Sequence, residues 1–107
     1  MHSFTENLKH LPSIIGVERI ELFDPQGMPG GVIRNQPGES GSLAIYNFLL
    51  GKWGDINAAA ANEGVTLYGE HAQDARDNPG KHPNIDRLLI LVLDASFYTG
   101  KIVRREI

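Results

Sequence analysis

Two histidines and several acidic residues gather in one short polar stretch of this 107-residue chain. The stretch runs over residues 69–87 and contains His71, Asp74, His82 and Asp86. A histidine oriented by a carboxylate is a common general acid or base, because the ordinary pKa of histidine lies near neutrality. These four side chains are therefore the candidate catalytic set of a hydrolase- or lyase-like enzyme.

The same stretch contains groups that can bind a metal ion. His71, Asp74 and His82 combine imidazole and carboxylate ligands that suit zinc, manganese or iron. His71 and Asp74 are three residues apart and would share one face of a helix. No compact ligand motif such as H-E-x-x-H is present, so no metal is favoured and the sequence identifies no cofactor.

Further polar side chains of this stretch are typical of a site for a small ligand. They carry carboxylate, amide or cationic groups and comprise Glu70, Arg76, Lys81, Asn84 and Arg87. The alternative is a solvated loop in which Asp74 caps a helix or pairs with Arg76, and Asp86 pairs with Arg87. Such surface pairs are common and contribute little to stability.

The secondary structure around the stretch decides whether the two histidines meet. Residues 88–94 are the most apolar run of the chain, and a short continuous apolar run is typical of a strand buried on both faces. Residues 65–68 predict a short strand before His71. His71 would then follow one strand while His82 precedes another, at opposite edges of a parallel sheet. We therefore expect the two histidines to lie apart.

The first half of the chain predicts helices and one hairpin. Ser3 and Glu6 have the spacing of a capping box, which indicates an opening helix. Residues 17–24 and 31–35 predict two strands joined by a turn and paired antiparallel. Leu43 to Trp53 carry apolar residues at spacings of three and four, which predicts an amphipathic helix.

The second half adds further helices and a last strand. Asp55 is the expected N-cap of a helix that ends at Gly64, and residues 70–77 permit one or two helical turns before a Pro–Gly loop. Residues 101–106 predict a final strand. The order favours a single α/β or α+β domain, with a mixed sheet of about five strands covered by roughly two to four helices.

The segment from Gly38 to Ser42 connects the predicted hairpin to the amphipathic helix. Backbone N–H groups at such a junction can bind a phosphate. The P-loop motif is absent, however, and the Glu39 carboxylate would repel an anion. A flexible loop with Ser40 or Ser42 as the helix N-cap is the favoured interpretation.

Phe97 and Tyr98 stand side by side in a predicted turn. Exposed aromatic residues often contact a partner, so this pair is the candidate interface for self-association. The alternative is that one of the two rings folds back over the sheet.

Composition excludes several functions and indicates others. A net charge of −3 argues against binding to nucleic acid or to a membrane surface. The absence of cysteine excludes disulfides and thiolate catalysis. No secretory signal is evident, and no run approaches the roughly 18 apolar residues that span a bilayer. We expect a cytoplasmic protein.

The segment from Tyr68 to Leu88 contains Gly69-Glu70-His71 near its start and Asn78-Pro79-Gly80-Lys81-His82-Pro83-Asn84 in its middle. This segment resembles the central signature of a small bacterial family of uncharacterised proteins. Members are similar in length to this chain. The resemblance implies a bacterial, cytoplasmic origin and no particular reaction.

Two functions follow from these observations. The favoured one is a small non-enzymatic domain that binds a protein partner or a small molecule, with homodimer formation through a strand edge or Phe97–Tyr98 as one form of that binding. The alternative is the hydrolase- or lyase-like enzyme built on His71 or His82. The alternative requires the two imidazoles and a carboxylate to meet in one pocket.

Overall fold

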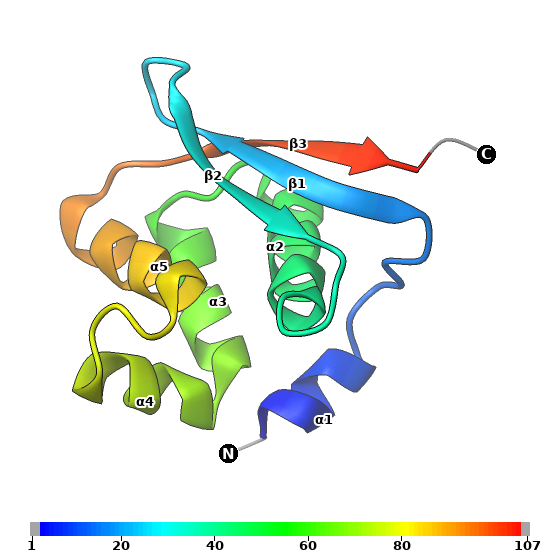
Figure 1. Cartoon of the computed structure of the whole chain (residues 1–107). Coiled ribbons are helices and arrows are strands. Elements are labelled where there is room, and N and C mark those ends of the chain that lie inside the picture. The colour runs from blue at the N-terminus through cyan, green and yellow to red at the C-terminus, as the bar shows by residue number, and fades with distance from the viewer. Residues whose placement is uncertain (1–2, 106–107) are drawn as a thin grey trace.

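A hairpin from the first half of the chain and a strand from its end form one antiparallel sheet (Figure 1). The computed structural model describes residues 3–105. Strand β1 (Val17–Phe23) lies between β2 (Pro29–Arg34) and β3 (Thr99–Arg104). The hairpin and the last strand expected from the sequence are therefore confirmed.

One face of the sheet is apolar because alternate residues of each strand point to the same side. Ile20 in the central strand is fully buried and pairs with Ile33 on β2 and with Ile102 on β3. Arg19 and Glu21 on the other face form an ion pair at 2.8 Å. The sheet therefore has one side for the core and one for solvent.

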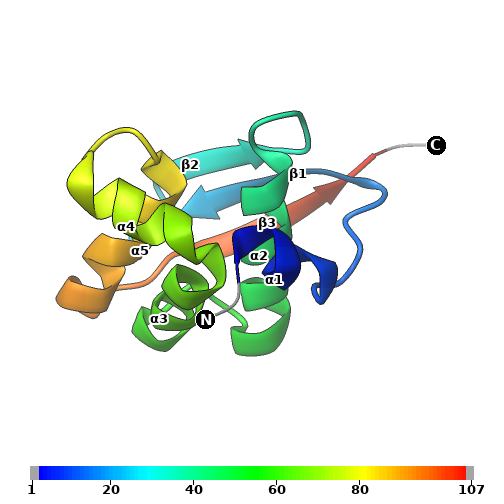
Figure 2. The same cartoon turned by 90° about the horizontal axis from the view of Figure 1, so that it is seen from below.

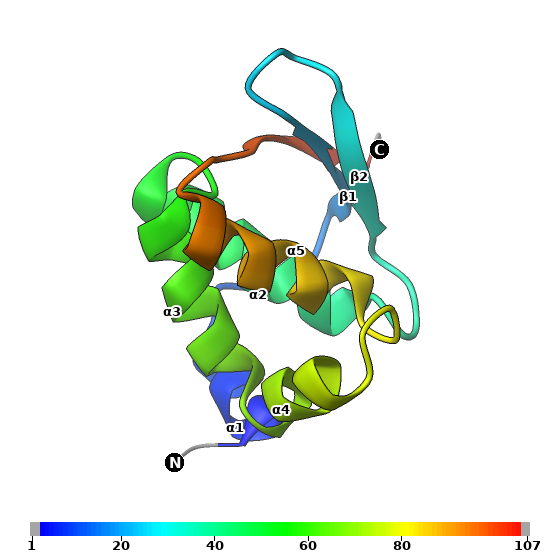
Figure 3. The same cartoon turned by 90° about the vertical axis from the view of Figure 1, so that its left-hand side faces the viewer.

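Helices cover the apolar face of the sheet (Figures 1 and 2). In the described part of the chain they are α1 (Phe4–Lys9), α2 (Ser40–Trp53), α3 (Ala58–Tyr68), α4 (Glu70–Asp77) and α5 (Pro83–Asp94). Helix α2 packs against β1 and β2, and α3 packs against α2 and α5. Figure 3 shows α5 between the sheet and α4. The result is a single compact α+β domain.

Residues 88–94 are helical, so the expected central strand is wrong. Pro83 occupies the first turn of α5, where its missing N–H costs nothing. Ile85, Leu88 and Leu91 are buried at steps of three residues, whereas Leu93 is 85% exposed. The apolar run thus covers the core along one side of a helix and leaves its other side in solvent.

Residues 65–68 also belong to a helix, because α3 continues through Gly64 instead of ending there. A Cβ atom at Gly64 would lie 2.8 Å from side-chain atoms of both Leu49 and Leu88. Glycine is therefore the residue that lets α3 lie close to its two neighbours. The N-cap is Asn57, whose side chain accepts from the Ala60 N–H at 2.8 Å, and not the expected Asp55.

Loss of the two expected strands removes every parallel pair, so the mixed sheet of about five strands is replaced by three antiparallel strands. The opening helix with Ser3 as N-cap, the helix around residues 43–53 and the helical turns over residues 70–77 are confirmed. Within residues 3–105, no helix has the length and apolar character needed to cross a bilayer.

Candidate functional site

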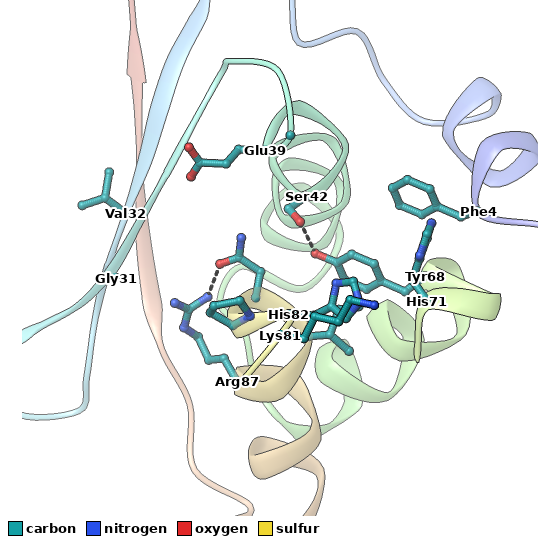
Figure 4. Close-up of a pocket in the computed structure, with 14 residues that line it drawn as sticks. Phe4, Gly31, Val32, Glu39, Ser42, Tyr68, His71, Lys81, His82 and Arg87 are labelled. Atoms are coloured by element: carbon teal, nitrogen blue, oxygen red, sulfur yellow. Dashed lines mark hydrogen bonds between the residues drawn. The ribbon is translucent and has the colours of Figure 1, made fainter. Parts of the chain in front are cut away.

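A cleft of about 640 Å³ opens where the starts of α2, α4 and α5 face strand β2 (Figure 4). The residues that line it are Phe4, Gly31, Val32, Gly38, Glu39, Ser42, Tyr68, His71, Lys81, His82, Pro83, Asn84, Ile85 and Arg87. Segments that are distant in the chain therefore meet here. Polar and aromatic side chains share the walls.

Arg87 occupies one end of the cleft and is held by the core. Its Nη1 donates to the Asn84 side-chain oxygen at 2.9 Å and to the Tyr46 hydroxyl at 3.1 Å. The guanidinium also lies 5.7 Å from the ring centre of Tyr46 and 6.0 Å from that of Tyr98. Burial raises the pKa of the Tyr46 hydroxyl to about 12, so the group that fixes Arg87 stays neutral.

The charge of Arg87 has no carboxylate partner within residues 3–105. The pairing considered from the sequence, with Asp86, is not formed, because Asp86 instead accepts from the Gly80 N–H at 2.9 Å. The N–H groups on Nε and Nη2 of Arg87 have no acceptor in the same described region. This edge of the guanidinium therefore has no hydrogen-bond acceptor among residues 3–105, and its Nη2 lies next to Gly31.

Gly31 makes room for the free edge of Arg87. A Cβ atom at this position would lie 2.4 Å from Nη2 of Arg87. The backbone of Gly31 also has φ +143°, a conformation that residues with a side chain rarely adopt. Both properties require glycine where β2 faces the cleft.

His71 and His82 meet at the cleft, with ring centroids 5.9 Å apart. The expectation that they lie at opposite edges is wrong, because it depended on strands that are helices. His82 Nε2 donates to Asp74 Oδ2 at 2.6 Å, and Lys81 Nζ donates to the same oxygen at 2.9 Å. These two bonds, the one from His82 first, lower the pKa of the Asp74 carboxyl to about 2.

An aromatic cluster of Phe4, Tyr68 and His71 forms the end of the cleft away from Arg87. Phe4 stacks parallel to Tyr68 with centroids 5.7 Å apart, and its ring meets His71 edge-on at 4.8 Å. The Tyr68 hydroxyl donates to Ser42 Oγ at 2.6 Å. Burial raises the pKa of Tyr68, so this hydroxyl remains a neutral donor.

Of the residues expected at the site, His71, Lys81, His82, Asn84 and Arg87 line the cleft. The others have structural contacts or lie elsewhere. Glu70 accepts from the backbone N–H of Phe4 at 2.9 Å and ties α1 to α4. Arg76 lines a separate groove beside α5.

Several lining residues were not anticipated from the sequence. Phe4 carries no local signal of a site, and the sequence of the segment from Gly38 to Ser42 favours a flexible loop. Glu39, and not a serine, is the N-cap of α2. Its carboxylate accepts from the Arg34 N–H at 3.4 Å and from the Gln36 side chain. Glu39 therefore lines the cleft as an acid already in contact with the β2–α2 loop.

Phe97 and Tyr98, the expected interface, have different surroundings in the structure. Tyr98 exchanges two backbone hydrogen bonds with Ile56 and is only partly exposed. Its ring lies against Gly30, where a Cβ would be 2.5 Å away. Phe97 is 37% exposed. Tyr98 thus folds back onto the domain, the alternative that the sequence left open.

The chemistry available in the cleft is acid binding and proton transfer. Arg87 supplies a fixed cation, and the Asp74–His82 pair can hold or release a proton. In the chain from residue 3 to 105, no three His, Cys, Asp or Glu side chains gather closely enough to hold a metal ion. His71, Asp74 and His82 therefore do not form such a group.

One protein family matches the chain, over residues 4–102. It is described as an uncharacterised protein conserved in bacteria, DUF2322. No curated protein and no solved structure matches. The family match confirms the resemblance carried by residues 68–88 and extends it over most of the chain.

Proposed function

Since the chain belongs to the DUF2322 family of uncharacterised bacterial proteins, we propose its function from the cleft. We propose that the protein is a small domain that binds a ligand with a negatively charged group. The observation that carries the proposal is Arg87. Arg87 lines the cleft, and its Nε and Nη2 donors have no acceptor among residues 3–105. A guanidinium edge of this kind binds carboxylate or phosphate through two parallel hydrogen bonds.

Preorganisation supports binding at this position. Arg87 is already fixed through Nη1 by Tyr46 and Asn84, so little side-chain entropy is lost when a ligand docks. The arrangement stabilises the arginine in the geometry that an acid group needs.

The surrounding charges favour an anion at the Arg87 end. Helices α2 and α5 both begin at the cleft, and neither has a side-chain cap on its first N–H groups. Helix starts carry partial positive charge. Glu39 opposes this field, although its oxygens are bonded to the β2–α2 loop. Lys81 adds a cation that is shared with Asp74.

A second candidate function is acid–base catalysis on the bound ligand. It is favoured by the 2.6 Å contact of His82 with Asp74 beside a cleft that His82 lines. The carboxylate can orient the imidazole and stabilise its protonated form. Binding through Arg87 is common to both functions, so it is tested first.

The test is calorimetric titration of the purified protein with inorganic phosphate and with citrate. Arg87→Met removes the charge but leaves the Tyr46 hydroxyl bonded to the Asn84 carbonyl. We expect this variant to weaken binding at least about tenfold, the loss typical of a charge-assisted pair. Arg87→Lys keeps the charge without the fork and should bind with intermediate affinity.

Lys101→Met is the matched control, because Lys101 is an exposed cation on β3 and does not line the cleft. It removes the same charge from the molecule and should leave the affinity unchanged. Equal weakening by both substitutions would show attraction to net charge only. Unchanged binding by Arg87→Met, with the fold checked by circular dichroism, would overturn the proposal.

A further inference from the structure

The two ends of the cleft differ in chemistry (Figure 4). Arg87 lies beside Gly31 at one end, and Phe4 and His71 lie at the other. Ser42 lies between the two ends and accepts from the hydroxyl of Tyr68, whose ring belongs to the aromatic end. A ligand that fills the cleft must therefore present an acid group at one end and a different group at the other.

The end away from Arg87 is suited to a flat ring. Phe4, Tyr68 and His71 form a continuous aromatic cluster with centroid distances of 5.7 and 4.8 Å. The ring of His82 lies 5.9 Å from that of His71 and extends this wall toward the middle. Aromatic faces and edges bind other rings by stacking and edge-to-face contact.

The size of the cleft fits a molecule that reaches both ends. Its volume of about 640 Å³ is well beyond a phosphate or a simple carboxylate, and lies within the range of small-molecule sites, roughly 300–1,000 Å³. A bare anion would leave the aromatic end in contact with water. A larger ligand would use both ends.

We infer that the ligand joins its acid group to a flat aromatic ring, as a nucleoside monophosphate does. The phosphate accepts from the guanidinium of Arg87, and the base lies against the wall formed by Phe4 and His71. The inference rests on the proposed function, because it uses the same arginine. It adds the chemical class of the ligand.

The test compares ligands that share one part. The four ribonucleoside 5′-monophosphates, ribose 5-phosphate and adenosine are titrated into the unmodified protein by calorimetry. We expect at least one nucleotide to bind about five- to a hundredfold more tightly than ribose 5-phosphate, the gain typical of one stacked base. Adenosine, which lacks the acid, should bind at least about tenfold more weakly than that nucleotide.

Substitutions then locate the ring. Phe4→Leu keeps an apolar side chain at the wall, and His71→Ala tests the same wall if α1 does not tolerate the first change. Each should reduce the preference for the nucleotide over ribose 5-phosphate to about twofold or less while leaving ribose 5-phosphate binding unchanged. Phe97→Leu is the control, because Phe97 does not line the cleft and should alter neither affinity.

The outcomes separate the two proposals. If ribose 5-phosphate binds through Arg87 as tightly as every nucleotide, the inference about the ring is wrong and the proposed function stands. A nucleotide preference that survives both Phe4→Leu and His71→Ala would also overturn it. If none of the phosphates binds, the proposed function itself fails.

Discussion

Helix α5 lies between two hollows that differ in the side chains it supplies to them. Its first turns supply Asn84 and Arg87 to the cleft, where hydrogen bonds fix them. Its last turns supply Leu89, Val92 and Leu93 to a groove of about 320 Å³ that α3 and α4 complete. One hollow presents oriented donors, and the other presents apolar surface.

The difference shows which hollow specifies a ligand. Exposed apolar side chains are common on folded proteins and are compatible with many partners or none. An arginine that is held by a buried tyrosine and has two donor atoms without an acceptor among residues 3–105 binds a much narrower set of chemical groups. For this reason we assign a function to the cleft and none to the groove, although Leu93 is 85% exposed.

The strongest test of the comparison uses two leucines of the same helix. Leu88→Ala should lower the free energy of unfolding by about 2–5 kcal/mol, because it leaves a cavity in the core. Leu93→Ala should change it by no more than about 0.5 kcal/mol. Leu88 is fully buried and Leu93 is 85% exposed. Urea unfolding followed by circular dichroism measures both values. Similar losses for the two variants would contradict the orientation of α5.

A smaller loss of stability is expected at Gly31, where β2 borders the cleft. Gly31→Ala adds a Cβ that would lie 2.4 Å from Arg87 and forces alanine into a φ of +143°. The strain should lower the unfolding free energy by about 1–3 kcal/mol. Displacement of the guanidinium should also weaken anion binding.

Gly51→Ala provides the matched control in helix α2. A Cβ at Gly51 has no atom within 4 Å, and alanine favours the helix by about 0.5–1 kcal/mol. This variant should be more stable than the parent protein in the same urea experiment and should bind ligand normally. A stable Gly31→Ala protein with full affinity would show that Arg87 does not need the space beside β2.

The smallest effect concerns acid pH. The Asp74 carboxyl has an ordinary pKa of 3.8 and a pKa of about 2 in the folded chain. Its folded pKa is lowered, so the stabilisation is present above pH 4 and disappears as the pH falls toward 2. The stability difference between the parent and Asp74→Asn should narrow over this interval. A stability difference between the two proteins that stays constant between pH 5 and 2 would contradict the lowered pKa of Asp74.

The hairpin and α2 were predictable because their signals are local. Residues 88–94 were not, since a short apolar run fits a buried strand as well as a helix. The helical period becomes visible only when Ile85 is included, because Ile85, Leu88 and Leu91 form the buried side together. Pro83 at the helix start was the other available signal.

The candidate site was predictable in its composition but not in its geometry. Lys81, Asn84 and Arg87 were expected to bind a ligand, and they do line one cleft. Arg87 has no acid partner within the described residues 3–105 because Asp86 accepts from the Gly80 N–H instead, which the types of the neighbouring residues do not reveal. Phe4 reaches the cleft from the other end of the chain, and no spacing rule connects it to His71.

The contact between Gly31 and Arg87 has a consequence for how members of this family diverge. A residue with a side chain at position 31 and an arginine in its present orientation at position 87 exclude each other sterically. Arginine at 87 should therefore be found together with glycine at 31. A side chain at 31 should relax selection for the arginine, whereas loss of the arginine removes only the steric restriction at 31, because the φ of +143° still favours glycine. The two positions are 56 residues apart in the chain, and the dependence between them runs mainly from 31 to 87.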